Sequence, residues 1–186
     1  MNRFILFSVF LFLTSYGYSQ QVGVFTDSRD NKIYNTVAIE NSIWMAENLA
    51  YKAENGCRAY DDILSNGEKY GYLYTFETAQ NACPDGWRLP TKNDLDILLK
   101  TIGGGGRQAF DSLVLSKSFG FSALLSGVFF NDYEFYGIRV TAMFWSSSSA
   151  TSKEAWAMGI DDINADVTIN KGKKNFGYSV RCVLDK

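Results

Sequence analysis

Histidine is absent from the sequence, and cysteine and proline are scarce, with three and two residues. The lack of histidine excludes Ser-His-Asp and Cys-His nucleophile sites and histidine-based zinc sites. The three cysteines are too far apart to form a zinc or cluster motif. Neither sign of charge dominates, because the net charge is −2 and the basic residues are scattered. We therefore expect no nucleic-acid partner.

The N-terminus carries the pattern of a secretory signal. Arg3 precedes the apolar run FILFSVFLFL, and the small residues Gly17 and Ser19 follow it. This run of about ten residues is shorter than the roughly 20 that span a bilayer, and no later segment predicts a membrane span. We expect residues 1–19 to be a signal peptide and residues 20–186 to form one domain that is secreted, periplasmic or on the cell surface.

Export permits disulfide bonds, and three cysteines leave one over. Cys83 and Cys182 lie in strongly patterned segments, whereas Cys57 lies in the polar loop KAENGCRAYDD. We therefore predict a Cys83–Cys182 disulfide. Cys57 is then a free or intermolecular thiol, and it provides a possible route to a dimer.

The best-signalled helix begins after Pro90. Thr91 can cap it, Asp94 can return the capping hydrogen bond, and Gly103 marks its end. Apolar residues at spacings of three and four form one stripe, namely Leu95, Leu98, Leu99 and Ile102. The segment 75–82 predicts a second helix.

Strands are predicted on both sides of these helices. Residues 33–39 and 43–45 form a hairpin around Glu40-Asn41, whereas residues 52–69 have no sustained period and predict a long surface loop. Alternating segments follow at 140–144, 156–160, 167–169 and 178–182. In the last one, Cys182 should face inward, and Ser179, Arg181 and Val183 should face outward.

An aromatic pair beside a serine run is the predicted binding region. Surfaces that bind sugars combine flat aromatic faces with short hydrogen-bonding side chains. The candidate residues are Trp145, Ser146 and Ser147, with Tyr133 and Tyr136 upstream. The alternative is that Trp145 belongs to the core and the serines form a turn.

A weak calcium motif lies near the C-terminus. Asp162, Asn164 and Asp166 alternate as in the opening of an EF-hand loop, but Val167 and Lys173 replace the glycine and glutamate that the loop requires. The three side chains could still converge on a calcium ion from one face of a hairpin. A polar hairpin edge is the alternative.

Several stretches resemble the Fibrobacter succinogenes major paralogous domain, a family of exported and surface proteins of bacteria. They are TDSRDNKIYNTVAIENSIWMAENLAY from Thr26, KYGYLYTFETAQNACPDGWRLPTKNDL from Lys69, FGFSALLSG from Phe119, FWSSS from Phe144 and GYSVRCV from Gly177. The resemblance implies an α+β fold similar to C-type lectins and sulfatase-modifying-factor enzymes, with two helices, small antiparallel sheets and long irregular loops. It implies the same Cys83–Cys182 pairing.

The sequence also departs from the proteins of that fold. The Glu-Pro-Asn and Gln-Pro-Asp tripeptides of calcium-dependent sugar binding are absent, and no cysteine pair lies in the late loops. We therefore expect a non-enzymatic recognition or adhesion module without a required cofactor, whose ligand is a glycan or a cell-surface protein. The alternatives are a carboxylate-dependent polysaccharide hydrolase and a structural envelope protein.

Overall fold

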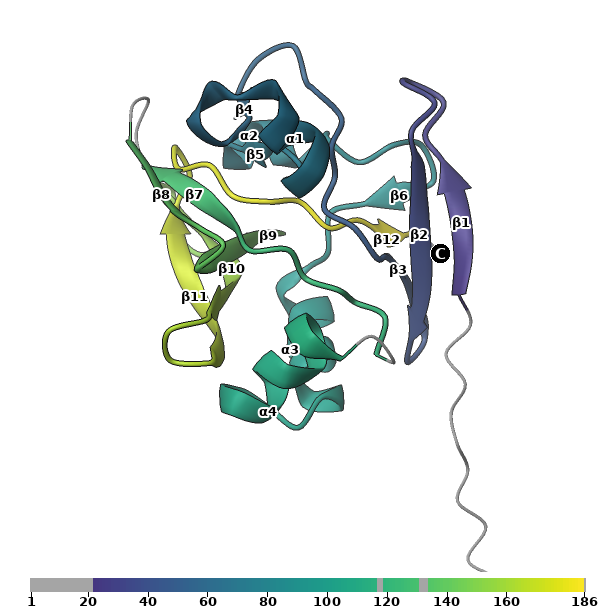
Figure 1. Ribbon diagram of the computed structural model, residues 1–186, viewed down its shortest axis with the longest axis vertical. Coiled ribbons are helices and arrows are strands. Elements are labelled where there is room, and N and C mark those ends of the chain that lie inside the picture. Colours follow the sequence, from purple (N-terminus) through teal and green to yellow (C-terminus); the bar gives the residue numbers. More distant parts are fainter. Residues whose placement is uncertain (1–21, 117–118, 131–133, 186) are drawn as a thin grey trace, which may run out of the picture.

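The computed structural model describes residues 22–116, 119–130 and 134–185. The predicted signal peptide, residues 1–19, lies outside them. The fold is α+β, as predicted. Two sheets stand on opposite sides of the domain, and the helices lie at its two ends (Figure 1). Each helix in the described part of the chain is too short or too polar to cross a bilayer.

The first sheet joins strands from the beginning, the middle and the end of the sequence. The predicted hairpin is present, with β2 paired to β3 and Val37 opposite Trp44. The order is β1-β2-β3-β12-β6, so the C-terminal strand lies between N-terminal and central ones. The bounds are β1 Val22–Thr26, β2 Ile33–Ile39, β3 Ser42–Met45, β6 Trp87–Arg88 and β12 Val183–Leu184.

The second sheet contains three of the four predicted late strands; the fourth, 178–182, is not a strand and makes only isolated bridges, at Tyr178 and Ser179. Its order is β11-β10-β9-β7-β8, so β11 and β8 are its two edges. Its strands are β7 Ser126–Phe130, β8 Glu134–Ile138, β9 Thr141–Ser149, β10 Glu154–Asp161 and β11 Asp166–Lys173. A small ladder between β4 Cys57–Arg58 and β5 Leu73–Tyr74 lies at the upper end of the view in Figure 1.

The capped helix is confirmed as α3, Lys92–Thr101. The Thr91 hydroxyl accepts a hydrogen bond from the Asp94 amide at 3.2 Å, and the Asp94 carboxylate accepts one from the Thr91 amide at 2.7 Å. This reciprocal pair satisfies two amides that a helix start leaves unbonded. The other helices are α1 Leu64–Tyr70, α2 Phe76–Ala79 and α4 Gly106–Phe110, which continues as a π-helical turn, Asp111–Leu115.

Two further sequence predictions need correction. The segment 52–69 is not one irregular loop, because it contains β4, a 3₁₀ turn Tyr60–Asp62 and most of α1. Ser179, Arg181 and Val183 do not face solvent, because each is at most 1% exposed. The chain after β11 crosses the middle of the domain to reach β12 (Figure 1), so both faces of this segment are covered.

Candidate functional site

Trp145, the residue expected to contact a ligand, belongs to the core. It is 0% exposed, and its indole Nε1 donates a hydrogen bond to the Tyr74 carbonyl at 2.8 Å. Its ring packs against Phe76 and Tyr178, with centroids 5.5 and 4.2 Å away. Ser146 is also 0% exposed, and its hydroxyl donates to the Trp156 carbonyl at 2.8 Å. Assigning these two residues to a surface site was wrong.

The other predicted binding residues do not form one surface with each other. Tyr136 is 59% exposed on β8, at one edge of the second sheet. Ser147 is half-buried on β9, and β7 separates β9 from β8. Tyr133 lies outside the described residues. The predicted aromatic and serine surface is therefore not assembled by the residues that the structure describes.

The predicted calcium residues form a hairpin turn between β10 and β11. Asp166 Oδ1 accepts hydrogen bonds from the amides of Gly106 and Val167, both at 2.8 Å. The Asn164 amide donates to Asp161 at 2.8 Å, which lowers the pKa of the Asp161 carboxyl. No group of three or more His, Cys, Asp or Glu side chains within 22–116, 119–130 and 134–185 is placed to hold a metal ion. Asp162 and Asn164 lie in the turn, and Asp166, the first residue of β11, holds the amides of Gly106 and Val167.

A groove of about 690 Å³ opens at the end of the second sheet where β10 begins and β11 ends. We call it the end groove. The hydroxyl, amide and charged side chains that line it are Thr151, Ser152, Lys153, Glu154, Lys173, Lys174 and Asn175. Strand pairing brings its two walls together, because Glu154 lies opposite Lys173 and the Lys174 amide donates to the Lys153 carbonyl at 2.9 Å.

The serine run reaches the end groove through its last residue. Lys174 Nζ donates a hydrogen bond to the Ser149 hydroxyl at 2.9 Å. The same ammonium lies 4.9 Å from the ring centroid of Phe76 on α2, which is a cation–π distance. The region that sequence patterning selected therefore borders the groove, although Trp145 and Ser146 point into the core.

A half-buried tryptophan lies beside the groove on the outer face of β10. Trp156 is two residues along the strand from Glu154, so the two side chains share a face. Lys171 lies directly opposite Trp156, with Nζ 5.4 Å from the indole centroid, and Lys92 Nζ lies 5.0 Å from it. Sequence analysis missed this cluster, although the exposed Lys171 and Lys173 alternate along β11.

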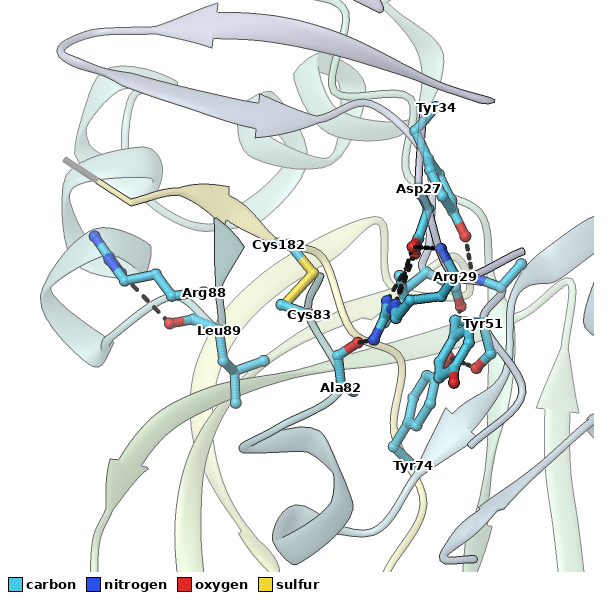
Figure 2. Close-up of a disulfide and its surroundings, with 12 residues drawn as sticks. Asp27, Arg29, Tyr34, Tyr51, Tyr74, Ala82, Cys83, Arg88, Leu89 and Cys182 are labelled. Carbon is cyan, nitrogen blue, oxygen red and sulfur yellow. Dashed lines mark hydrogen bonds and ion pairs between the residues drawn. A yellow bond between two sulfur atoms is a disulfide. The ribbon is translucent and has the colours of Figure 1, made fainter. Parts of the chain in front are cut away.

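The disulfide links the two halves of the domain, as predicted. Cys83 and Cys182 are 99 residues apart, and their Cα atoms are 5.9 Å apart (Figure 2). Arg29 reinforces the same region by donating to the Ala82 carbonyl at 2.9 Å and to the buried Asp27 carboxylate at 2.7 Å. Burial alone would raise the pKa of Asp27, but the hydrogen bonds and charge of Arg29 outweigh it and lower the pKa.

Arg181 holds the centre of the domain together as a buried cation. Its guanidinium donates to the carbonyls of Met45 and Phe121 and to Asn48 Oδ1, and it lies 4.3 Å from the Phe121 ring centroid. Burial lowers the pKa of Arg181 to about 9. Carbonyl dipoles and aromatic faces thus replace the carboxylate partner that a buried arginine usually has.

Cys57 is the free cysteine among the described residues. It is half-buried on β4, and its thiol donates to the Ala53 carbonyl at 3.3 Å. Burial raises the pKa of this thiol, which lowers the fraction present as the reactive thiolate. These surroundings do not favour rapid disulfide exchange with a second copy.

Comparison with known proteins identifies the family. A search of curated proteins and a search of solved structures each returned no match. The family model described as the Fibrobacter succinogenes major domain matches residues 37–184, which include the helices, the second sheet, the end groove and the first sheet without β1 and the start of β2. The chain therefore belongs to the Fibrobacter succinogenes major domain family.

Proposed function

We propose that this protein is an exported, non-enzymatic recognition module that binds a glycan in the end groove. The proposal rests on the groove itself, where hydroxyl, amide and ammonium groups come together at one end of a sheet beside the half-buried Trp156. Such groups hydrogen-bond sugar hydroxyls, and an aromatic face packs against the apolar face of a sugar ring.

The scaffold supports binding rather than catalysis. The groove walls are held by paired strands, and the disulfide and Arg181 fix the segment that follows β11, so little conformational entropy is lost on binding. A glycoside hydrolase needs one carboxyl group with a raised pKa as its general acid. Each carboxyl group with a resolved pKa shift in the described part of the chain is shifted downward, which favours the ionised form.

Two further proposals concern location and fold. The predicted signal at residues 1–19 supports export to the periplasm, cell surface or medium, where glycans are accessible. A fold of the C-type-lectin-like type is supported by one sheet that contains both terminal strands, β1 and β12, and by the Cys83–Cys182 bridge beside it.

A polysaccharide binding panel with a groove-blocking variant tests the proposed function. Ser152 is exposed, so Ser152→Trp should fill part of the groove without altering the core. Ser28 is exposed in the turn between β1 and β2, and Ser28→Trp is the matched control. We expect the wild type and Ser28→Trp to bind the same glycan and Ser152→Trp to lose it. Absence of wild-type binding across the panel, or equal binding by Ser152→Trp, would overturn the proposal.

A further inference from the structure

We infer that the ligand of the end groove is an acidic polysaccharide, whose sugar units carry carboxylate or sulfate groups. The inference rests on the proposed function and names its ligand class. Lys153, Lys173 and Lys174 line the groove, and Lys171 lies two residues away on the same face of β11 as Lys173. With Glu154 these side chains carry a net charge of +3, on a chain whose net charge is −2.

The positive charge of the groove is not neutralised by the protein. Within the described residues, none of these four lysines forms an ion pair, although Glu154 lies opposite Lys173 in the strand register. By contrast, Lys92, whose Nζ lies 5.0 Å from the Trp156 ring, is paired with Asp96 at 2.8 Å. Unpaired ammonium groups around a concave surface concentrate positive potential there, which attracts an anionic ligand.

Aromatic rings hold several of these ammonium groups in place. Lys171 lies over Trp156, Lys173 Nζ lies 5.5 Å from the Phe176 centroid, and Lys174 lies over Phe76. A freely moving lysine loses side-chain entropy when it binds an anion, and a cation–π contact reduces that loss. The lysines are therefore partly positioned for a ligand before it arrives, unlike lysines that only solvate a surface.

The neutral lining favours a sugar over other polyanions. Ser152 and Asn175 line the groove, and the Ser149 hydroxyl touches Lys174, so neutral hydrogen-bonding groups lie next to the ammonium groups. Nucleic acids and anionic membranes are bound mainly through extended basic surfaces. Here four lysines gather around one groove of a chain whose net charge is −2.

Matched neutral and acidic polysaccharides test the ligand class on the mature chain. The pairs are dextran with carboxymethyl-dextran, dextran with dextran sulfate, and methyl-esterified with de-esterified pectin, each measured by affinity electrophoresis and biolayer interferometry. We expect the acidic member of at least one pair to bind about tenfold more tightly than its neutral partner. Raising the salt from 50 to 200 mM should weaken this binding about tenfold, as expected for two or three ion contacts.

Two variants that lose the same charge, one in the groove and one elsewhere, show whether the groove lysines cause the tighter binding of acidic polysaccharides. Substitution of the groove lysines by glutamine, in the triple variant Lys153→Gln, Lys173→Gln and Lys174→Gln, should reduce the affinity about tenfold or more. The control Lys52→Gln, Lys69→Gln and Lys100→Gln removes the same charge elsewhere and should bind within about twofold of the wild type. Urea unfolding of both variants checks that they are folded.

The outcomes separate the two proposals. Equal or tighter binding of the neutral members overturns the acidic class and leaves glycan binding intact. No binding to any member overturns both. Equal binding of single-stranded DNA or of vesicles rich in anionic lipid, lost in the same triple variant, would make the groove a general polyanion site and overturn the assignment to a glycan.

Discussion

Substitution of Trp145 by alanine should lower the free energy of unfolding by about 4 to 6 kcal/mol. Removing a fully buried tryptophan side chain costs about 3 to 5 kcal/mol in lost transfer energy and in the cavity that remains. The indole hydrogen bond to Tyr74 adds about 1 kcal/mol. The Tyr74 carbonyl keeps a second donor, the Tyr178 amide at 3.0 Å, so it is not left unsatisfied.

Urea unfolding monitored by far-UV circular dichroism measures this loss directly. Trp156→Ala is the matched control, because the same residue type is removed from a half-buried position at the groove. We expect Trp156→Ala to cost only about 1 to 2 kcal/mol, since part of its ring stays in solvent. The two variants should therefore separate a core tryptophan from a surface one.

A loss of less than about 1 kcal/mol in Trp145→Ala would refute the burial argument. It would return Trp145 to the surface, where sequence patterning first placed it. The second refuting result is a reversed order, with Trp156→Ala the more destabilised variant. In that case the outer face of β10 would be part of the core, and the end groove would lose its aromatic neighbour.

Three further predictions follow from the structure. Replacing Cys83 and Cys182 together by alanine should lower the free energy of unfolding by about 4.7 kcal/mol, the chain-entropy value for a loop of about 100 residues, and a loss under 1 kcal/mol in urea would contradict it. The pKa of the Asp27 carboxyl is lower in the folded protein than its ordinary 3.8, so the stability that Asp27 contributes is present above pH 3.8 and is lost as the pH falls further. The free energy of unfolding of Asp27→Asn, measured in urea, should therefore change less between pH 5 and pH 2 than that of the wild type. An equal change in both proteins would argue against this role. The Cys57 thiol should react slowly with Ellman's reagent in the folded state and rapidly in urea, and the oxidised protein should run as a monomer on a non-reducing gel, whereas a Cys57-dependent dimer would contradict the burial argument.

The elements that were predicted correctly are those whose sequence signals lie within a few residues of one another. The helix α3 has its capping residues three positions apart, and the β2–β3 hairpin has its turn between two alternating strands. The disulfide was also predictable, because only two of the three cysteines lie in patterned segments. In each case the deciding contact is local or follows from the hydrophobic period.

The errors at Trp145 and at Arg181 have one physical cause, which is that both faces of the segments that carry them are covered. On β9, Phe144 belongs to one core cluster and the adjacent Trp145 to the other, so the alternation of buried and exposed residues fails there. The same holds for Arg181, whose partners Asn48 and Phe121 are 133 and 60 residues away in the sequence. The hydrophobic period of a strand does not reveal which segments, distant in the sequence, cover its two faces.

The end groove was missed for a related reason. Lys173 and Lys174 are adjacent in the sequence, but Lys153 joins them only through the pairing of β10 with β11. In the linear sequence the lysines look scattered, and the fold gathers them. The family match places this pairing inside the domain, but it identifies no ligand for it.

Binding of a glycan in the end groove can be mapped residue by residue with NMR. The backbone amides of ¹⁵N-labelled protein, residues 20–186, would be followed during titration with the best polysaccharide from the panel. We expect the chemical-shift changes to concentrate in residues 149–156 and 171–175 and to disappear in Ser152→Trp. Shifts centred instead on Tyr136 and β8, at the opposite edge of the sheet, would contradict this expectation.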